Sequence, residues 1–300
     1  MGLPVANFSR MFFTYSYERV RVTELNPLYN DPAIIAQNPF LADSLLLGAG
    51  GRRTISKVTP SFIHNTIDNP IFPNRGRRIT SSLDVAGIGG DTYFLKPRFE
   101  AVQLWQMAPR TTLALRGQIE YIRPYASTET LPLFETLFLG GEYSVRGYDI
   151  RSIGPRDLRT GLVLGGNKSL LFNAEYMISI AGPVRLILFY DAGQVRVRGE
   201  PFAMKEDITE IVQPNQPLLV DPFANPILTD PDAPGSVSQV IGQRSAFKTS
   251  TGAEVRFFMP VLNVPFRLIF AFNPQRGGIY TNSLQPAKAF QFRFAVGSTF

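Results

Sequence analysis

Residues 290–300 read Phe-Gln-Phe-Arg-Phe-Ala-Val-Gly-Ser-Thr-Phe, and the alternation in this stretch decides the fold class. Successive side chains of a β-strand point to opposite faces, so a period of two indicates a strand with one apolar and one polar face. The apolar face carries Phe290, Phe292, Phe294, Val296 and Phe300, and the other face carries Gln291, Arg293, Gly297 and Thr299.

The same period of two recurs along the rest of the chain. Counted with residues 289–300, it gives about ten strands, most of them roughly 9–15 residues long. Strands of soluble domains average about 5–6 residues, whereas strands that cross a membrane need about 9–11. The lengths therefore favour membrane-spanning strands. The other segments are 8–23, 54–66, 78–88, 92–105, 111–123, 169–180, 184–191, 247–259 and 264–273.

The lengths of the connections separate a membrane barrel from a soluble β-sandwich, which also alternates. In a sandwich the apolar face is the core, whereas in a barrel it contacts lipid and the polar face lines a lumen. Short turns on one rim and long loops on the other are typical of outer-membrane barrels. The sequence therefore predicts an all-β, transmembrane antiparallel β-barrel over residues 1–300. Short turns occur at 181–183 and 262–263, and long connections at 25–53, 124–167, 198–246 and 273–289; we interpret 198–246 as an acidic surface loop.

The composition argues against most catalytic chemistry. Cysteine is absent, His64 is the single histidine, and no cluster has metal-ligand spacing. The chain has neither a Gly-x-Ser-x-Gly elbow nor a phosphate-binding loop. The 30 Lys and Arg residues give a net charge of +6, but they are scattered singly, which argues against nucleic acid as a partner. We expect no enzyme activity, no catalytic residue, no metal and no cofactor.

One glycine-rich loop, residues 140–150, contains a single arginine, Arg146. Glu175 and Asp191 fall on the polar phase of two strands joined by a short turn. That turn pairs position 175 with position 189, so Asp191 becomes a diagonal neighbour of Glu175 on the same face. Two such carboxylates repel each other unless a cation lies between them, and a guanidinium suits that place. The alternative is that Glu175 and Asp191 are merely hydrated lumen residues.

Three sequence blocks resemble the outer-membrane assembly factor family of BamA, the bacterial surface antigen barrels, whose relatives include TamA and the two-partner secretion transporters. Val145-Arg146-Gly147-Tyr148, extended upstream by Gly140 and Gly141, is similar to the Val-Arg-Gly-Phe/Tyr signature of that family. Residues 189–193 resemble its aromatic-Asp-Ala-Gly strand, and residues 70–76 resemble its Phe-Pro-x-x-Gly turn. The order and spacing of the blocks agree over nearly the whole chain.

The resemblance implies a function and its site residues. It implies assembly and insertion of β-barrel proteins into the bacterial outer membrane, with the loop at 124–167 folded into the lumen and Arg146 contacting Glu175 and Asp191. It also implies a lateral seam at the last strand, which accepts client strands by edge pairing. The expected partners are outer-membrane lipids, unfolded β-barrel clients and accessory lipoproteins. The seam residues would be Phe290, Phe292, Phe294 and Phe300, although Ser298 stands where an apolar residue is usual.

The alternatives are a polypeptide secretion pore of the same superfamily, or a membrane barrel attached to a patatin-like lipase. The family has sixteen strands and N-terminal POTRA domains, whereas this chain offers about ten strands, so we expect a fragment that corresponds to the C-terminal part of the barrel. Residues 1–7 resemble no signal peptide. A fragment of this kind would leave an open edge at about residues 8–23. Several upstream POTRA repeats would favour assembly, about two would favour secretion, and a lipase domain would favour the enzyme.

Overall fold

The computed structural model describes residues 2–21, 52–128, 131–156, 163–212, 237–259, 264–281 and 285–297. No helix within these ranges is long and apolar enough to cross a membrane. The strands are β1 (Gly2–Ala6), β2 (Ser9–Arg21), β3 (Arg52–Asn65), β4 (Gly76–Ala86), β5 (Phe94–Ala108), β6 (Thr111–Tyr121), β7 (Arg123–Pro124), β8 (Lys168–Ala181), β9 (Val184–Arg196), β10 (Lys205–Val212), β11 (Val237–Ser245), β12 (Lys248–Met259), β13 (Val264–Phe272) and β14 (Phe290–Val296).

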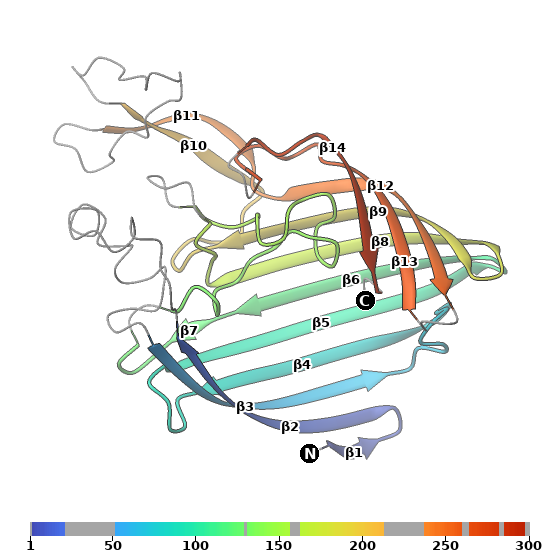
Figure 1. The fold of residues 1–300 in the computed structure, drawn as a ribbon, viewed down its shortest axis with the longest axis horizontal. Helices are drawn as coiled ribbons and strands as arrows, with labels where there is room; N and C mark the ends of the chain where they lie inside the picture. The colour runs from blue at the N-terminus through green and yellow to red at the C-terminus, as the bar shows by residue number, and fades with distance from the viewer. Residues whose placement is uncertain are drawn as a thin grey trace.

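A single antiparallel sheet of 12 strands forms the body of the protein (Figure 1). Its order is β1-β2-β3-β4-β5-β6-β8-β9-β12-β13-β14, and the short β7 pairs with β5. The ten strands expected from the alternation are all present, which confirms the all-β antiparallel prediction. Among the described residues the sheet does not close, so β1 and β14 lie at its two ends. Figure 1 shows β12, β13 and β14 curling over one side of the broad sheet.

The edge expected at residues 8–23 is partly covered. Residues 2–6 form β1, which pairs with the first part of β2 through Gly2–Phe12 and Leu3–Met11. The chain turns back at Asn7 and Phe8, so the few residues before β2 are long enough to form a short hairpin with it. Among the described strands, the remainder of β2 pairs only with β3.

The polarity of the two faces is inverted relative to a soluble sheet, as β8 illustrates. Phe172 and Tyr176 point outward and are 44% and 37% exposed, whereas Asn173 and Glu175 point inward and are fully buried. A soluble sandwich would bury the aromatic face and expose the polar one. The observed arrangement is that of a membrane barrel with a polar interior.

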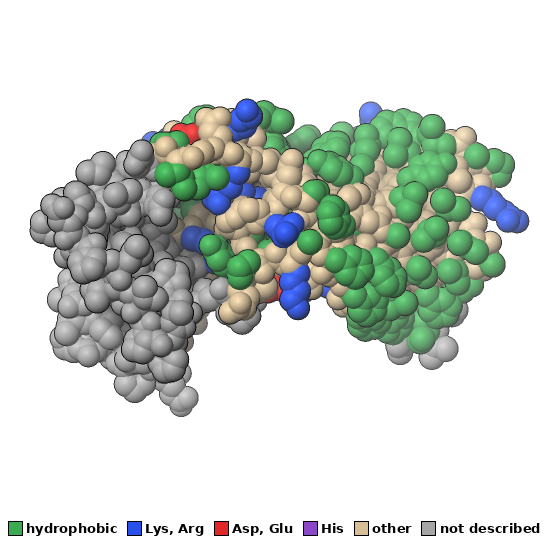
Figure 2. Space-filling model, turned by 90° about the horizontal axis from the view of Figure 1, so that it is seen from above, with side chains coloured by type: hydrophobic (Ala, Val, Ile, Leu, Met, Phe, Trp, Pro, Cys, Tyr) green, Lys and Arg blue, Asp and Glu red, His purple; other side chains and the backbone are tan. Residues whose placement is uncertain are grey.

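Large apolar side chains cover much of the outer surface. In Figure 2 they gather over the right-hand part of the visible face, toward the rim at which the β8–β9 turn lies in Figure 1. A soluble monomer rarely exposes so much contiguous apolar surface, so lipid is its natural environment. Examples from six strands are Phe13, Tyr15, Phe99, Trp105, Ile119, Leu188, Tyr190, Leu268, Phe270, Phe290, Phe292 and Phe294.

The segment 198–246, expected to be an acidic surface loop, contains a β-hairpin near its two ends. Lys205–Val212 and Val237–Ser245 form the β10–β11 hairpin, a separate two-stranded sheet. Glu206 fixes its base by binding Arg196, Arg244 and Lys248 at 3.1, 2.6 and 2.7 Å. Burial opposes the ionised carboxylate, but hydrogen bonds from Lys248 and Arg244 outweigh it and lower the pKa of Glu206. Sequence alternation missed the hairpin because β10 begins with three successive charged residues, Lys205, Glu206 and Asp207, which put charges on both of its faces.

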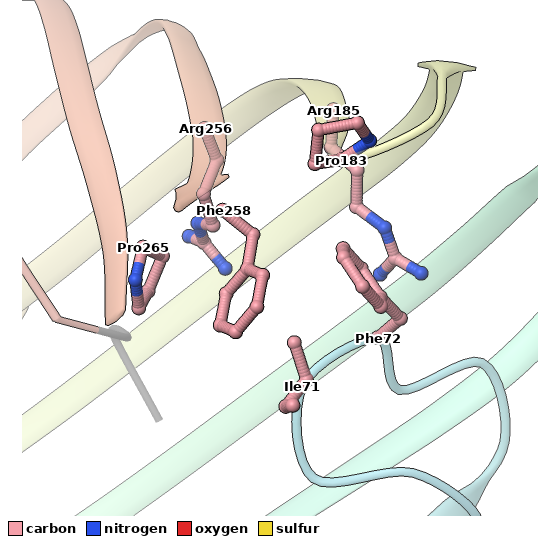
Figure 3. A pocket seen from close by; sticks show the side chains of 7 residues that line it. All are labelled: Ile71, Phe72, Pro183, Arg185, Arg256, Phe258 and Pro265. Atoms are coloured by element: carbon pink, nitrogen blue, oxygen red, sulfur yellow. The ribbon is translucent and has the colours of Figure 1, made fainter. Parts of the chain in front are cut away.

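The connection between β3 and β4 folds across the rim that carries the short turns (Figure 3). Its Phe72 ring lies edge-on to Phe258 of β12, with 5.6 Å between centroids. The Arg185 guanidinium of β9 lies 4.9 Å from the Phe72 ring centroid and donates to the Pro73 carbonyl at 3.2 Å. The β3–β4 connection, which contains the Phe-Pro-x-x-Gly block, therefore packs against β9 and β12, two strands further along the sheet.

We predict that the β14 phenylalanines contact lipid in the membrane. Phe290, Phe292 and Phe294 are 58%, 54% and 57% exposed on the outer face, and the absence of native cysteine in this chain makes single-cysteine variants straightforward. In membranes, Phe292→Cys should react with an aqueous maleimide about tenfold more slowly than Gln291→Cys, because only the inner face meets water. Equal labelling of the two variants would show that the face of β14 that carries the phenylalanines does not contact lipid.

Candidate functional site

The long connection after β7 lies against the inner face of the sheet over residues 131–156. Leu139 and Ile153 exchange two backbone hydrogen bonds of 3.0 and 2.9 Å, and the Gly141 N–H donates to the Tyr148 carbonyl at 3.1 Å. These bonds close residues 139–153 into a compact loop, hereafter the lumen loop. Its tip presents Arg146 to the inward side chains of the sheet.

Arg146 is fully buried and uses its backbone and side chain together. Its Nε and Nη2 donate to the two oxygens of Asp191 at 2.8 and 2.7 Å, and its backbone N–H donates to Asp191 Oδ2 at 3.0 Å. Its Nη1 donates to Glu175 at 2.7 Å. The β8–β9 register pairs Glu175 with Phe189, as the short turn predicts. The structure thus brings together the three residues selected from the sequence.

A third carboxylate, Glu254 of β12, completes the site. Its Oε2 accepts from Arg146 Nη1 at 3.1 Å, and it also binds Arg256 and Arg267, each at 2.7 Å. The alternation of residues 247–259 puts Glu254 on the polar face of its strand, but it does not by itself place Glu254 in this cluster. Glu254 reaches the cluster because β9 pairs directly with β12, which brings Glu254 opposite Ile187.

The charges of this cluster balance. Three carboxylates, Glu175, Asp191 and Glu254, face three guanidinium groups, those of Arg146, Arg256 and Arg267. Burial disfavours the cationic form of Arg146, but the attraction of Asp191 and Glu175 outweighs this effect, so its pKa is raised. A buried charge cluster is stable only while every member is paired, and loss of one partner is costly.

Aromatic and aliphatic contacts surround the charged cluster. The Arg146 guanidinium carbon lies 3.8 Å from the centroid of the Phe189 ring, a cation–π geometry. Val145 and Tyr148 are buried in one apolar cluster with Leu139. A Cβ atom at Gly193 would lie 2.6 Å from Leu139 Cδ1 and 3.1 Å from Val145 Cγ2. The absence of a side chain at Gly193 therefore allows the loop to approach β9.

Gly147 is needed for a different reason. Its φ of +80° lies in the left-handed region, which strains residues with a side chain. A Cβ at this position would lie 2.6 Å from Ala271 Cβ and 2.7 Å from Asn273 Oδ1. The Gly147 carbonyl also accepts from Asn273 Nδ2 at 2.9 Å. The glycine of the signature therefore places the loop directly on β13 and the segment that follows it.

A second charged contact fixes an earlier part of the same connection. Glu135 is buried and binds Lys57 of β3 and Lys96 of β5, both at 3.3 Å. Sequence reasoning missed Glu135 because nothing in its local pattern indicates which strands it faces. The connection is therefore held at β3 and β5 as well as at β8, β9 and β12.

The residues predicted for the seam lie on the last described strand. Phe290, Phe292 and Phe294 point outward from β14, and the rings of Phe292 and Phe294 pack near Phe270 and Phe266 with centroids 5.1 and 5.7 Å apart. Phe300 and Ser298 lie outside the described residues.

The described residues offer no metal cluster of three or more His, Asp or Glu side chains. His64 Nδ1 lies 2.9 Å from Ser9 Oγ. The other ring nitrogen of His64 is buried and has no hydrogen-bond partner among the described residues. A serine nucleophile needs a base oriented by a carboxylate through that second nitrogen. This pair therefore lacks the arrangement of a hydrolase triad.

We predict that Arg146→Ala destabilises the barrel by about 3–5 kcal/mol, because it leaves three buried carboxylates with two arginines. Arg146→Lys should lie between wild type and alanine, since an ammonium cannot reproduce the forked contact with Asp191. The measurement is urea unfolding in lipid vesicles, with the exposed Arg10→Ala on β2 as the matched control. Equal stability of the Arg146→Ala and Arg10→Ala variants would contradict the prediction.

We predict that Gly147→Ala costs about 2–4 kcal/mol, the sum of backbone strain and overpacking against β13. Gly89→Ala is a close control, because Gly89 has a similar φ of +85° but no atom lies within 4 Å of the place that its Cβ would take. In the same unfolding assay, the difference between the two variants isolates the packing contribution. If both variants lose the same stability, the close approach of the loop to Ala271 is not what requires glycine.

Comparison with known proteins supplies the family. The outer membrane protein assembly factor BamA of Neisseria meningitidis is 27% identical over 205 residues, which cover 65% of this chain and 25% of that protein. A SAM50-like protein of Schizosaccharomyces pombe is 30% identical over 165 residues, which cover 51% of this chain and 34% of that protein. The matches therefore span only about a quarter to a third of these relatives.

A solved structure shares the fold. BamA from Haemophilus ducreyi lacking POTRA domains 1–3 superposes with a TM-score of 0.64 at 16% identity, over 99% of this chain and 52% of that one. The family model described as the Omp85 superfamily domain matches residues 1–300. With its polar interior, apolar outer face and anchored lumen loop, the chain belongs to the Omp85 superfamily.

Proposed function

We propose that the protein carrying this chain folds and inserts β-barrel proteins into the bacterial outer membrane, without a cofactor or ATP. The names of the relatives support this proposal: BamA is an outer membrane protein assembly factor. A further relative, from Bos taurus and 29% identical over 117 residues, is a sorting and assembly machinery component 50 homolog. Neither name denotes an enzyme. Because relatives from eukaryotes also match, the bacterial location rests on the BamA matches.

The observation that carries the proposal is the filling of the interior by the lumen loop. Arg146 at the tip of the loop is fully buried, and so are its partners Glu175 on β8 and Asp191 on β9. A polypeptide that passed through the interior would have to displace this loop and separate a paired charge cluster, which is costly. A client strand that adds to the edge of the sheet needs no such displacement. The geometry therefore favours edge-wise assembly over secretion through the lumen, and it offers nothing specific to an attached lipase.

The last strand is the natural place for that addition. Among the described strands β14 pairs only with β13, so one row of its backbone N–H and C=O groups has no strand partner. Such an edge accepts an extended segment through main-chain hydrogen bonds. The outer-face phenylalanines of β14 would then contact lipid, and accessory lipoproteins would act outside this chain.

We expect Arg146→Ala to slow client insertion about tenfold or more, because a destabilised loop no longer holds the barrel in shape. The assay is reconstitution of the protein carrying this chain in lipid vesicles, addition of an unfolded outer-membrane β-barrel protein, and measurement of its heat-modifiable, protease-resistant form. Arg10→Ala is again the control. Transport of a non-barrel polypeptide into the vesicles, with no barrel insertion, would favour the secretion pore instead.

A further inference from the structure

The lumen loop also contacts β14, the strand at the end of the sheet. Arg293 of β14 points inward and pairs with Glu142 at 3.3 Å and with Asp149. The Tyr143 hydroxyl donates to the Val296 carbonyl near the end of the strand. We call Glu142, Tyr143, Asp149 and Arg293 the β14 contact set. None of these four residues belongs to the Val-Arg-Gly-Tyr signature at residues 145–148.

The β14 contact set is continuous with the buried cluster around Arg146. Arg267 Nη2 binds Glu254 at 2.7 Å, and Arg267 Nη1 donates to the Glu142 carbonyl at 3.1 Å. Glu142 and Asp149 stand on either side of Arg146 in the loop, so fixing Arg146 also fixes the two carboxylates that Arg293 binds. A displacement of the loop tip would therefore be transmitted to β14.

The two sets of contacts differ in burial. The side chains of Arg146 and its three carboxylate partners are 0% exposed, whereas those of Arg293, Glu142 and Asp149 are 20%, 12% and 23% exposed. Ion pairs that water reaches are weaker than buried pairs whose partners cannot be resolvated. The contacts to β14 should therefore break before those around Arg146.

We infer that Arg293 is a positioning residue through which the lumen loop restrains the end of β14. While Arg293 binds Glu142 and Asp149, the inner face of β14 is fixed to the loop and the strand keeps its place beside β13. When these contacts open and the Arg146 cluster remains intact, the end of β14 gains freedom to move and to pair with an incoming strand. Pairing of β14 with an incoming strand rests on the proposed function, whereas the restraint of β14 by the lumen loop does not depend on that function.

The restraint is tested by hydrogen–deuterium exchange of the peptide that covers residues 290–297, in the protein carrying this chain in lipid vesicles. Arg293→Gln should increase exchange there about tenfold, since hydrogen bonds to charged groups are lost, while β8, β9 and β12 keep their exchange rates. Arg10→Gln on β2, at the opposite end of the sheet, should change neither region. Tyr143→Phe removes one hydroxyl without changing the shape of the residue, and it should produce a smaller increase in the same peptide.

Charge reversal separates the ion pairs from a general effect of substitution. Arg293→Glu places a third acid beside Glu142 and Asp149 and should loosen β14 more than Arg293→Gln does. Adding Glu142→Arg restores an opposite pair and should recover part of the protection. Unchanged exchange of residues 290–297 in Arg293→Gln and Arg293→Glu, or no recovery in the double variant, would overturn the inference.

The insertion assay distinguishes this inference from the proposed function. If the lumen loop restrains β14 and clients add to β14, the Arg293→Gln variant should insert clients several-fold faster than wild type. The gain in insertion rate should follow the increase in the population of released β14. Faster exchange at β14 with an unchanged insertion rate would overturn the role of the restraint in insertion. If the wild-type protein inserts no client at all, the proposed function fails, and the exchange experiment still decides whether Arg293 restrains β14.

Discussion

The burial of one guanidinium among three carboxylates is the interaction on which the interior of this protein depends. Arg146 cannot be deprotonated to escape burial, so it requires anionic partners, and Glu175, Asp191 and Glu254 require cations in return. The partners come from β8, β9 and β12, whereas Arg146 comes from a loop. The cluster therefore forms only when the sheet has its curvature and the loop lies inside it.

The same interaction explains how a barrel wall with a polar inner face obtains a packed interior. A soluble protein would fill this space with aliphatic side chains from a second layer. Here the lumen loop provides that layer: Val145, Tyr148 and Leu139 pack against sheet residues such as Leu171 and Val195. Charged contacts at Glu135 and Arg146 fix the position of the loop, and the apolar contacts exclude water between them.

The sequence predicted what depends on local pattern and failed where the result depends on distant neighbours. Strand phase and one short turn sufficed to pair Glu175 with Phe189 and to place Asp191 nearby. Glu254 could not be placed in the same way, because the β10–β11 hairpin had to be recognised as lying outside the main sheet before β12 could become the neighbour of β9. Glu135 and Arg293 are harder still, since their partners lie far away in the chain: those of Glu135 are on β3 and β5, and those of Arg293 are in the lumen loop.

The connection after β7 is thus held by charges of both signs: Glu135 toward β3 and β5, Arg146 at the centre, and Glu142 with Asp149 toward β14. Arg146 binds carboxylates, whereas Glu142 and Asp149 bind a guanidinium, so a shift that exchanged their places would bring like charges together. Burial is complete at the centre and lower at β14. A loop fixed in this way keeps its register in the interior. Its contacts with β14 are more exposed than the Arg146 cluster, so they can open without displacing the tip of the loop.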